Sequence, residues 1–138
     1  MVSGYSGTPL AKKLGVKGAQ RTWRSGMPKT VAEEIGLSGM SPVLLASPKS
    51  GLEMAHIFVT RRVDLSKILR KLRPLLEPGG TIWVSWPKKA SKVPSDVNED
   101  DIRAEAFPLG LVDVKVCAVD ETWSGLKLVI RKSERSRT

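Results

Sequence analysis

Basic residues follow three short apolar runs in the middle of this chain. The runs are "PVLLAS" (42–47), "EMAHIFVT" (53–60) and "TIWVSW" (81–86), and each has the length of a β-strand. If these strands are parallel, the residues after them meet at one edge of the sheet, where ligands of open α/β sheets bind. Five cations there would attract an anion, and a tryptophan beside them could stack on a planar ring. We call this set the basic edge: Lys49, Thr60, Arg61, Arg62, Trp86, Lys88 and Lys89.

The same residues also allow an interpretation without a ligand. Trp86 alternates with Ile82 and Val84, so its side chain can instead close the core beneath a helix. The lysines would then be solvated loop residues. The sequence leaves both interpretations open.

A second group of candidates lies in "DETWSG" (120–125) and comprises Asp120, Glu121 and Trp123. Paired carboxylates can act as general acid and base. Such residues are more often turn formers and surface charges. Trp123 could pack against a neighbouring element or against a second copy of the protein.

The single cysteine, Cys117, and the single histidine, His56, each lie in a strand-like run. A cysteine nucleophile needs a neighbouring base and an electropositive, exposed setting. Only the fold could bring His56 close enough, so we expect a core cysteine and a half-buried histidine. One cysteine also excludes an internal disulfide and a cysteine-based zinc cluster, and we predict no metal site and no catalytic residue.

A nucleotide-type cofactor would need a glycine-rich turn after the first strand and an acidic residue after the second. The early glycines Gly15, Gly18 and Gly26 are not in G-x-G spacing, and "VLLASPK" ends in Lys49 where an acid would stand. We therefore predict no cofactor, with S-adenosylmethionine as the alternative.

Two short helices are expected before the first apolar run. Thr8 can cap the first, Pro9 suits its first position and Gly15 ends it. The second covers residues 30–35, where "TVAE" has the form of a capping box. Residues 18–28 between them are polar, and the sequence does not decide whether they form a strand of the sheet.

The clearest helix covers residues 64–77, with Asp64 as a plausible N-cap and a kink or break expected at Pro74. It lies between two strand-like runs, which predicts a right-handed βαβ unit. Its apolar residues recur on one helical face: Leu65, Ile68, Leu69, Leu72, Leu75 and Leu76.

The last third predicts one more helix and a hairpin. Asp96 with Glu99 can cap a helix over residues 98–107. The runs "LVDVKVCAV" and "LKLVIRK" alternate on either side of a glycine-bearing connection, which favours an antiparallel pair.

Two strings, "LRPLLEPGGTIWVSW" and "AFPLGLVDVKVCAVDETWSGLKLVIRK", resemble the second half of a class I methyltransferase. This resemblance implies a Rossmann-like α/β domain of three layers, with a mainly parallel sheet and a C-terminal antiparallel hairpin. Four more strings, "GYSGTPLAKKLGVK", "FVTRR", "WVSWPKKASKV" and "LGLVDVKVCAVDETWSGLKLVIRK", are similar to a bacterial family of uncharacterised proteins, domain of unknown function 3052. That likeness implies a bacterial, cytoplasmic protein and carries no activity or catalytic residue; residues 18–41 depart most from it.

The length of 138 residues suits one domain over residues 1–138, with a polar tail expected to fray from about residue 133. No apolar run approaches the ~20 residues that span a bilayer, so we expect no membrane association. The net charge of +9 favours an anionic partner or only keeps the protein soluble. A basic segment, 61–73, and an acidic one, 96–105, could support self-association or be two solvated helix faces.

Together these patterns favour a non-enzymatic binding domain whose anionic ligand or partner lies at the carboxyl edge of the sheet. One alternative is an S-adenosylmethionine-dependent methyltransferase with an atypical cofactor site. The other is a nucleic-acid-binding accessory protein.

Overall fold

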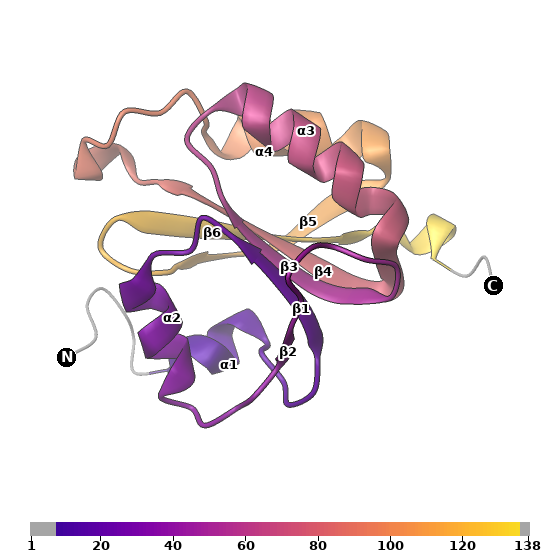
Figure 1. Cartoon of the computed structure of the whole chain (residues 1–138). Coiled ribbons are helices and arrows are strands. Elements are labelled where there is room, and N and C mark those ends of the chain that lie inside the picture. Colours follow the sequence, from indigo (N-terminus) through magenta and orange to yellow (C-terminus); the bar gives the residue numbers. More distant parts are fainter. Residues whose placement is uncertain (1–7, 136–138) are drawn as a thin grey trace.

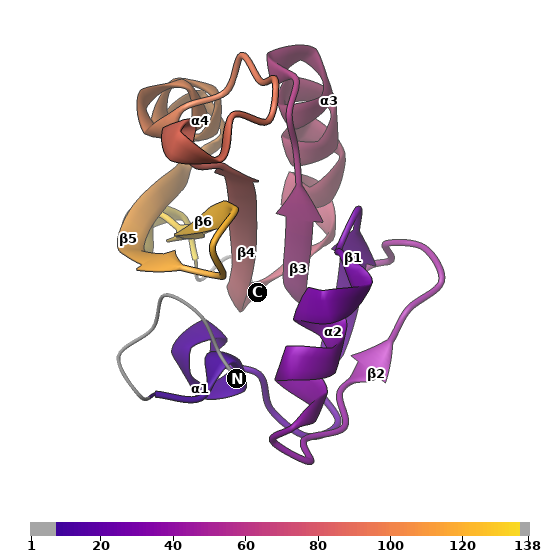
Figure 2. The same ribbon diagram turned by 90° about the vertical axis from the view of Figure 1, so that its left-hand side faces the viewer.

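The computed structural model describes residues 8–135. A six-stranded sheet lies between two helical layers (Figure 1). Helices α1 (Leu10–Leu14) and α2 (Lys29–Gly36) cover one face, and α3 (Arg62–Leu72) and α4 (Glu99–Ala106) cover the other. Figure 2 shows the same separation from the side, and the predicted three-layer α/β architecture is confirmed.

The strands follow the order β2-β1-β3-β4-β6-β5 across the sheet. The first four are parallel, whereas β6 is antiparallel to both β4 and β5, which confirms the predicted hairpin. After β1 the chain adds β2 on one side and then β3 on the other, so the strand order reverses between β1 and β3. The strands are β1 (Arg21–Ser25), β2 (Val43–Leu44), β3 (Leu52–Phe58), β4 (Leu76–Pro87), β5 (Leu111–Ala118) and β6 (Trp123–Ile130).

The βαβ unit predicted from hydrophobic periodicity is β3-α3-β4. Pro74 lies in a 3-10 turn (Arg73–Leu75) that ends α3, as expected from a residue that lacks the N–H of a continuing helix. The proposed N-cap Asp64 is wrong, because Arg61 is the N-cap and Asp64 lies in the first turn. The backbone N–H of Arg62 instead donates to Asp96 Oδ1 at 2.7 Å.

The predicted N-cap of α4, Asp96, is also wrong. Asp96 stabilises the start of α3, and the N-cap of α4 is Asn98. Asn98 forms a reciprocal capping box with Asp101: the N–H of Asp101 donates to Asn98 Oδ1, and the N–H of Asn98 donates to Asp101 Oδ2, both at 2.9 Å.

Neither of the first two helices uses the predicted threonine cap. The N-caps are Pro9 and Pro28, and no side chain caps either helix. Their carbonyl oxygens accept from the first turn, so a proline directly before each helix sets its start and leaves Thr8 and Thr30 without that role. Gly15 does end α1, in the left-handed conformation at φ 76°.

Residues 18–28, which the sequence left undecided, contain β1, a strand enclosed by β2 and β3. Its inward position is occupied by Thr22, only 1% exposed, whose hydroxyl donates to the Gln20 carbonyl at 3.0 Å. This hydrogen bond makes a polar residue acceptable in the core, and the strand therefore lacks an apolar signature. The neighbouring run 42–47 yields only the two residues of β2.

The two tryptophans of β4 face opposite sides of the sheet. Trp86 belongs to the core under α3 and α4 and is 8% exposed. Trp83 is fully buried under α1 and α2, where its Nε1–H donates to the Leu14 carbonyl at 2.8 Å. Within residues 8–135, no helix has both the length and the apolar content that a bilayer crossing needs.

Candidate functional site

The basic edge predicted from the sequence assembles only in part. Lys49 lies at the wrong end of the strands: the next two residues, Ser50 and Gly51, accept hydrogen bonds from the side chain of Arg21 at the start of β1. The connection from β2 has by then returned to the amino edge, because β3 begins at Leu52 and runs parallel to β1.

Two more cations of the basic edge are held by protein groups. Arg62 pairs with Asp101 at 2.9 Å and with Glu105 at 3.0 Å, both on α4. The Nζ of Lys88 donates to the Asp120 carbonyl at 2.6 Å. These contacts join elements of the chain, and they engage the cations that were expected to meet a ligand.

Trp86 is buried in the core, so the interpretation without a stacked ligand is correct for this residue. Thr60, Arg61 and Lys89 do lie beyond the carboxyl ends of β3 and β4, as predicted. Arg61 and Lys89 are exposed there.

The basic and acidic segments meet within one molecule. Arg62 at the start of α3 forms ion pairs with α4, so at this point the opposite charges of the two segments pair within one chain. These contacts between half-exposed groups contribute little to stability, but they fix the relative positions of the two helices. Self-association stays a prediction.

A pocket of about 280 Å³ opens where the strand order reverses. This is the position at which open α/β sheets bind ligands, outside the carboxyl ends of the strands. We call it the switch-point pocket. It offers hydroxyl groups, a carboxylate and an ammonium group beside apolar side chains, and its lining is Ser25 from β1, Phe58, Val59 and Thr60 at the end of β3, and Asp64, Lys67 and Ile68 from α3.

Gly26 brings the ends of β1 and β3 together beside this pocket. Its φ of +70° is a left-handed conformation, and a Cβ at this position would lie 3.1 Å from the Phe58 carbonyl oxygen. A side chain there would be strained and crowded. The glycine was visible in the sequence, but without G-x-G spacing it gave no cofactor motif.

A polar cluster lies on the other face of the same strand ends. Arg24 of β1 is paired in register with His56 of β3. His56 Nε2 and Ser85 Oγ of β4 are 2.7 Å apart, and the His56 ring stacks on Phe58 with centroids 4.5 Å apart. Trp123, one of the secondary candidates, packs edge-on against Phe58 at 5.1 Å.

The electrostatics of this cluster do not favour acid–base catalysis. Burial and, to a smaller extent, the positive charge of Arg24 lower the pKa of His56 to about 3. His56 is therefore neutral near pH 7 and binds a proton poorly. Ser85 has no exposed surface, so a substrate cannot reach its hydroxyl.

The remaining candidates have structural explanations. Asp120 Oδ1 accepts from the N–H groups of Thr122 and Trp123 at 2.9 and 2.8 Å, which is the role of a turn former. Glu121 is exposed. Burial raises the pKa of the half-buried Cys117 thiol, so it is a weak nucleophile. Among residues 8–135 no cluster of three or more histidine, cysteine or acidic side chains could hold a metal ion.

No model of a protein family matches the chain, and no curated protein matches it. Solved structures do match. An S-adenosylmethionine-dependent methyltransferase from Aquifex aeolicus aligns with a TM-score of 0.61 and 13% sequence identity, over 88% of this chain and 88% of that one. Magnesium protoporphyrin IX methyltransferase from Synechocystis PCC 6803, with bound S-adenosylmethionine, gives 0.56 and 11%, over 88% and 74%. Fibrillarin from Aeropyrum pernix, with natively bound S-adenosylmethionine, gives 0.54 and 14%, over 87% and 73%.

The fold is that of a class I methyltransferase. At these identities the likeness concerns the fold alone. The resemblance to domain of unknown function 3052, with the bacterial and cytoplasmic setting that it implies, stays a prediction.

The residues at the strand ends do not fit the usual nucleotide-type cofactor site. The turn between β1 and α2 contains one glycine, Gly26, and the residue two positions before it is the cation Arg24. Leu45, Ala46 and Ser47 follow β2, so no carboxylate stands where a ribose would be bound. This methyltransferase fold therefore lacks the two features from which cofactor binding is normally inferred.

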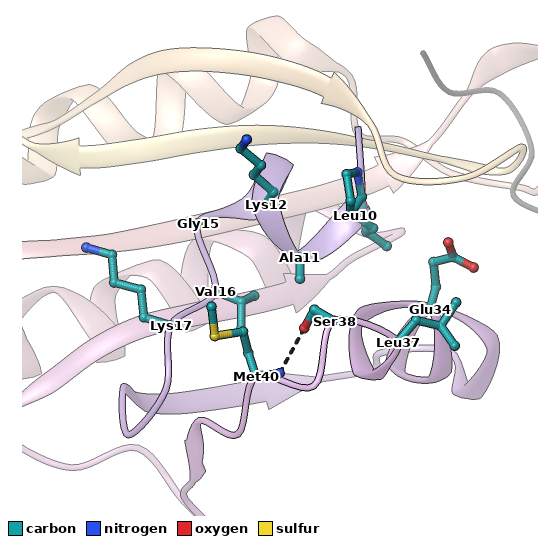
Figure 3. A pocket seen from close by; sticks show the side chains of 11 residues that line it. Leu10, Ala11, Lys12, Gly15, Val16, Lys17, Glu34, Leu37, Ser38 and Met40 are labelled. Atoms are coloured by element: carbon teal, nitrogen blue, oxygen red, sulfur yellow. Dashed lines mark hydrogen bonds between the residues drawn. The ribbon is translucent and has the colours of Figure 1, made fainter. Parts of the chain in front are cut away.

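A larger pocket of about 650 Å³ lies at the opposite edge (Figure 3). It opens between α1 and the end of α2, the helices that lead into β1 and β2, so it belongs to the amino edge. Ser38 Oγ accepts from the Met40 N–H at 3.0 Å and orders one wall. The lining is mainly apolar, with Leu10, Ala11, Val16, Leu37 and Met40 among its residues.

Proposed function

We propose that this protein is a non-enzymatic binding domain that holds a small anionic ligand in the switch-point pocket of its methyltransferase fold. The observation that supports this function is the position of the pocket at the reversal of strand order. Ser25 and Thr60 offer hydroxyl groups to a ligand there, and Lys67 offers a positive charge. Such a mixture of polar and apolar groups suits a small polar molecule.

Binding is a better explanation than catalysis because the candidate reactive groups are already engaged. His56 is neutral and bonded to Ser85, and Asp120 holds its turn. Among the described residues, no exposed nucleophile is hydrogen-bonded to a base, which nucleophilic catalysis requires.

A second candidate is an S-adenosylmethionine-dependent methyltransferase with an atypical cofactor site. The similarity in fold to two structures that hold S-adenosylmethionine supports it. Asp64 is the one carboxylate among the residues that line the switch-point pocket, so it would have to bind the ribose in place of an acid after β2. Nucleic-acid binding, the third interpretation from the sequence, stays a prediction.

Calorimetric titration with S-adenosylmethionine, S-adenosylhomocysteine and adenosine monophosphate tests the binding function. We expect at least one probe to bind, and Lys67→Gln to weaken that binding about tenfold, because a charge-assisted contact is lost. Lys71→Gln is the matched control, one helical turn further along α3 and outside the pocket lining.

The outcomes separate the candidates. Methyl transfer from bound S-adenosylmethionine to an acceptor in a cell extract would favour the methyltransferase. Equal loss of affinity in Lys67→Gln and Lys71→Gln would point to a diffuse electrostatic effect and contradict a site in this pocket.

A further inference from the structure

Arg24 is a half-buried cation beside the switch point. It is the fourth residue of β1 and is paired in register with His56, on the face of the sheet that α1 and α2 cover. The adjoining residue, Ser25, lines the switch-point pocket, and so does Phe58, which stacks on His56. Arg24 therefore lies at the same strand ends as the pocket, on the opposite face of the sheet.

The Arg24 guanidinium has no partner among the residues that the structure describes. No hydrogen bond or ion pair forms between it and residues 8–135, and residues 1–7 and 136–138 contain no aspartate or glutamate. The other half-buried arginines of the described chain are all engaged. Arg73, Arg103 and Arg131 pair with carboxylates, and Arg135 donates to the Ile130 carbonyl.

An unpaired guanidinium in this position is unfavourable for the free protein. Burial lowers the pKa of Arg24, which means that the surroundings disfavour its charge. The groups across the strand cannot compensate, because His56 is neutral and the Ser85 hydroxyl is bonded to it. A charge that is partly removed from water is usually paired, so the unpaired Arg24 points to an anion from outside the described residues.

We propose that Arg24 binds the anionic group of the ligand, a carboxylate or a phosphate, an inference that rests on the binding function proposed above. The planar guanidinium matches two oxygens of either group and remains charged at every physiological pH. Two residues after Arg24, Gly26 lets the chain pass close to the Phe58 backbone at the end of β3. The ligand lies across the ends of β1 and β3, with its anionic group at Arg24.

The inference separates a ligand-binding arginine from a structural one. Arg24→Met removes an unpaired charge and keeps an unbranched side chain, so the ligand-free variant should melt at the same temperature as the wild type or higher. A structural arginine would have favourable contacts to lose, and its replacement would lower the melting temperature.

The closing experiment compares three probes: adenosine monophosphate, which carries a phosphate, S-adenosylhomocysteine, which carries a carboxylate, and adenosine, which carries neither. We expect the wild type to bind one anionic probe more tightly than adenosine, and Arg24→Met to weaken that probe about ten- to a hundredfold without changing adenosine. Which probe responds identifies the anion. Arg24→Lys should recover part of the affinity, and Arg70→Met, an exposed arginine on α3, is the matched control.

Two results would overturn the inference. One refutes only the role of Arg24, and the other also refutes the binding function. If an anionic probe shifts the amide resonances of Ser25 and Thr60 but binds Arg24→Met unchanged, the binding function stands and the role of Arg24 is wrong. If none of the three probes binds at millimolar concentration, the binding function fails, and the inference fails with it.

Discussion

The two faces of the sheet are built differently although the same strands form both. Under α3 and α4 the strands contribute a continuous apolar core, with Ile82, Val84 and Trp86 from β4 alone. Under α1 and α2 the inward positions include Thr22, Arg24, His56 and Ser85, which are polar. The second face has a core of its own around Trp83, but polar groups from β1, β3 and β4 interrupt it. We propose that this polar face, at Arg24, is where the anionic group of the ligand binds.

The largest expected effect comes from a mutation in the apolar face under α3 and α4. Leu69 of α3 has no exposed surface, and Leu69→Ala leaves a cavity in the core. We expect the free energy of unfolding to fall by about 2–5 kcal/mol. Urea denaturation measures this, and a loss below about 1 kcal/mol would mean that this face is less tightly packed than the structure indicates.

A smaller effect tests the polar face through pH. The folded pKa of His56, about 3, lies below the ordinary value of 6.5. The unfolded chain therefore binds a proton as pH falls through 6.5, while the folded chain stays unprotonated until near pH 3. The stability contributed by neutral His56 is complete above pH 6.5 and is lost on acidification, by up to about 1.4 kcal/mol for each pH unit.

Replacement of His56 by phenylalanine removes this proton and leaves the carboxylates unchanged. The unfolding free energies of the wild type and of His56→Phe should be measured between pH 7 and pH 5. Their change with pH should differ by an amount that corresponds to up to one proton bound on unfolding. Since Arg24 and Ser85 are the polar groups that face His56 from β1 and β4, parallel pH profiles would show that the cluster is open to water.

The smallest effect concerns the loop between β4 and α4 at the carboxyl edge. Asp96→Ala removes the acceptor for the Arg62 N–H at the start of α3, and we expect a loss of about 1 kcal/mol. Asp64→Ala, in the first turn of the same helix, is the control. Thermal unfolding distinguishes them, and a larger loss in Asp64→Ala would restore the cap predicted from the sequence.

The sequence predicts what depends on local pattern. The leucines of α3 report burial through their spacing, so the βαβ unit was correctly predicted. The period-two alternation of β5 and β6 correctly predicted the hairpin, although Val114 and Val116 of β5 are exposed. Strand β1 has no such pattern, because its buried Thr22 is satisfied by a hydrogen bond. A polar residue that is paired inside the core looks like a loop residue in the sequence.

The candidate site was harder to predict because its members depend on distant partners. Arg62 meets residues of α4 almost forty positions later, and Lys88 meets the Asp120 carbonyl. Neither contact has a signature in the sequence. Arg24 lies in the stretch that was left undecided, and its significance comes from the lack of a partner among residues 8–135, which only coordinates reveal.

The most direct test of the switch-point pocket as a binding site is an amide chemical-shift map of the labelled protein during titration with adenosine monophosphate and S-adenosylhomocysteine. A site at the switch point predicts saturable shifts at Ser25, Gly26, Phe58 and Thr60. Shifts confined to Leu37 and Met40 in the larger pocket, or spread over the exposed surface of α3 and abolished by salt, would contradict it.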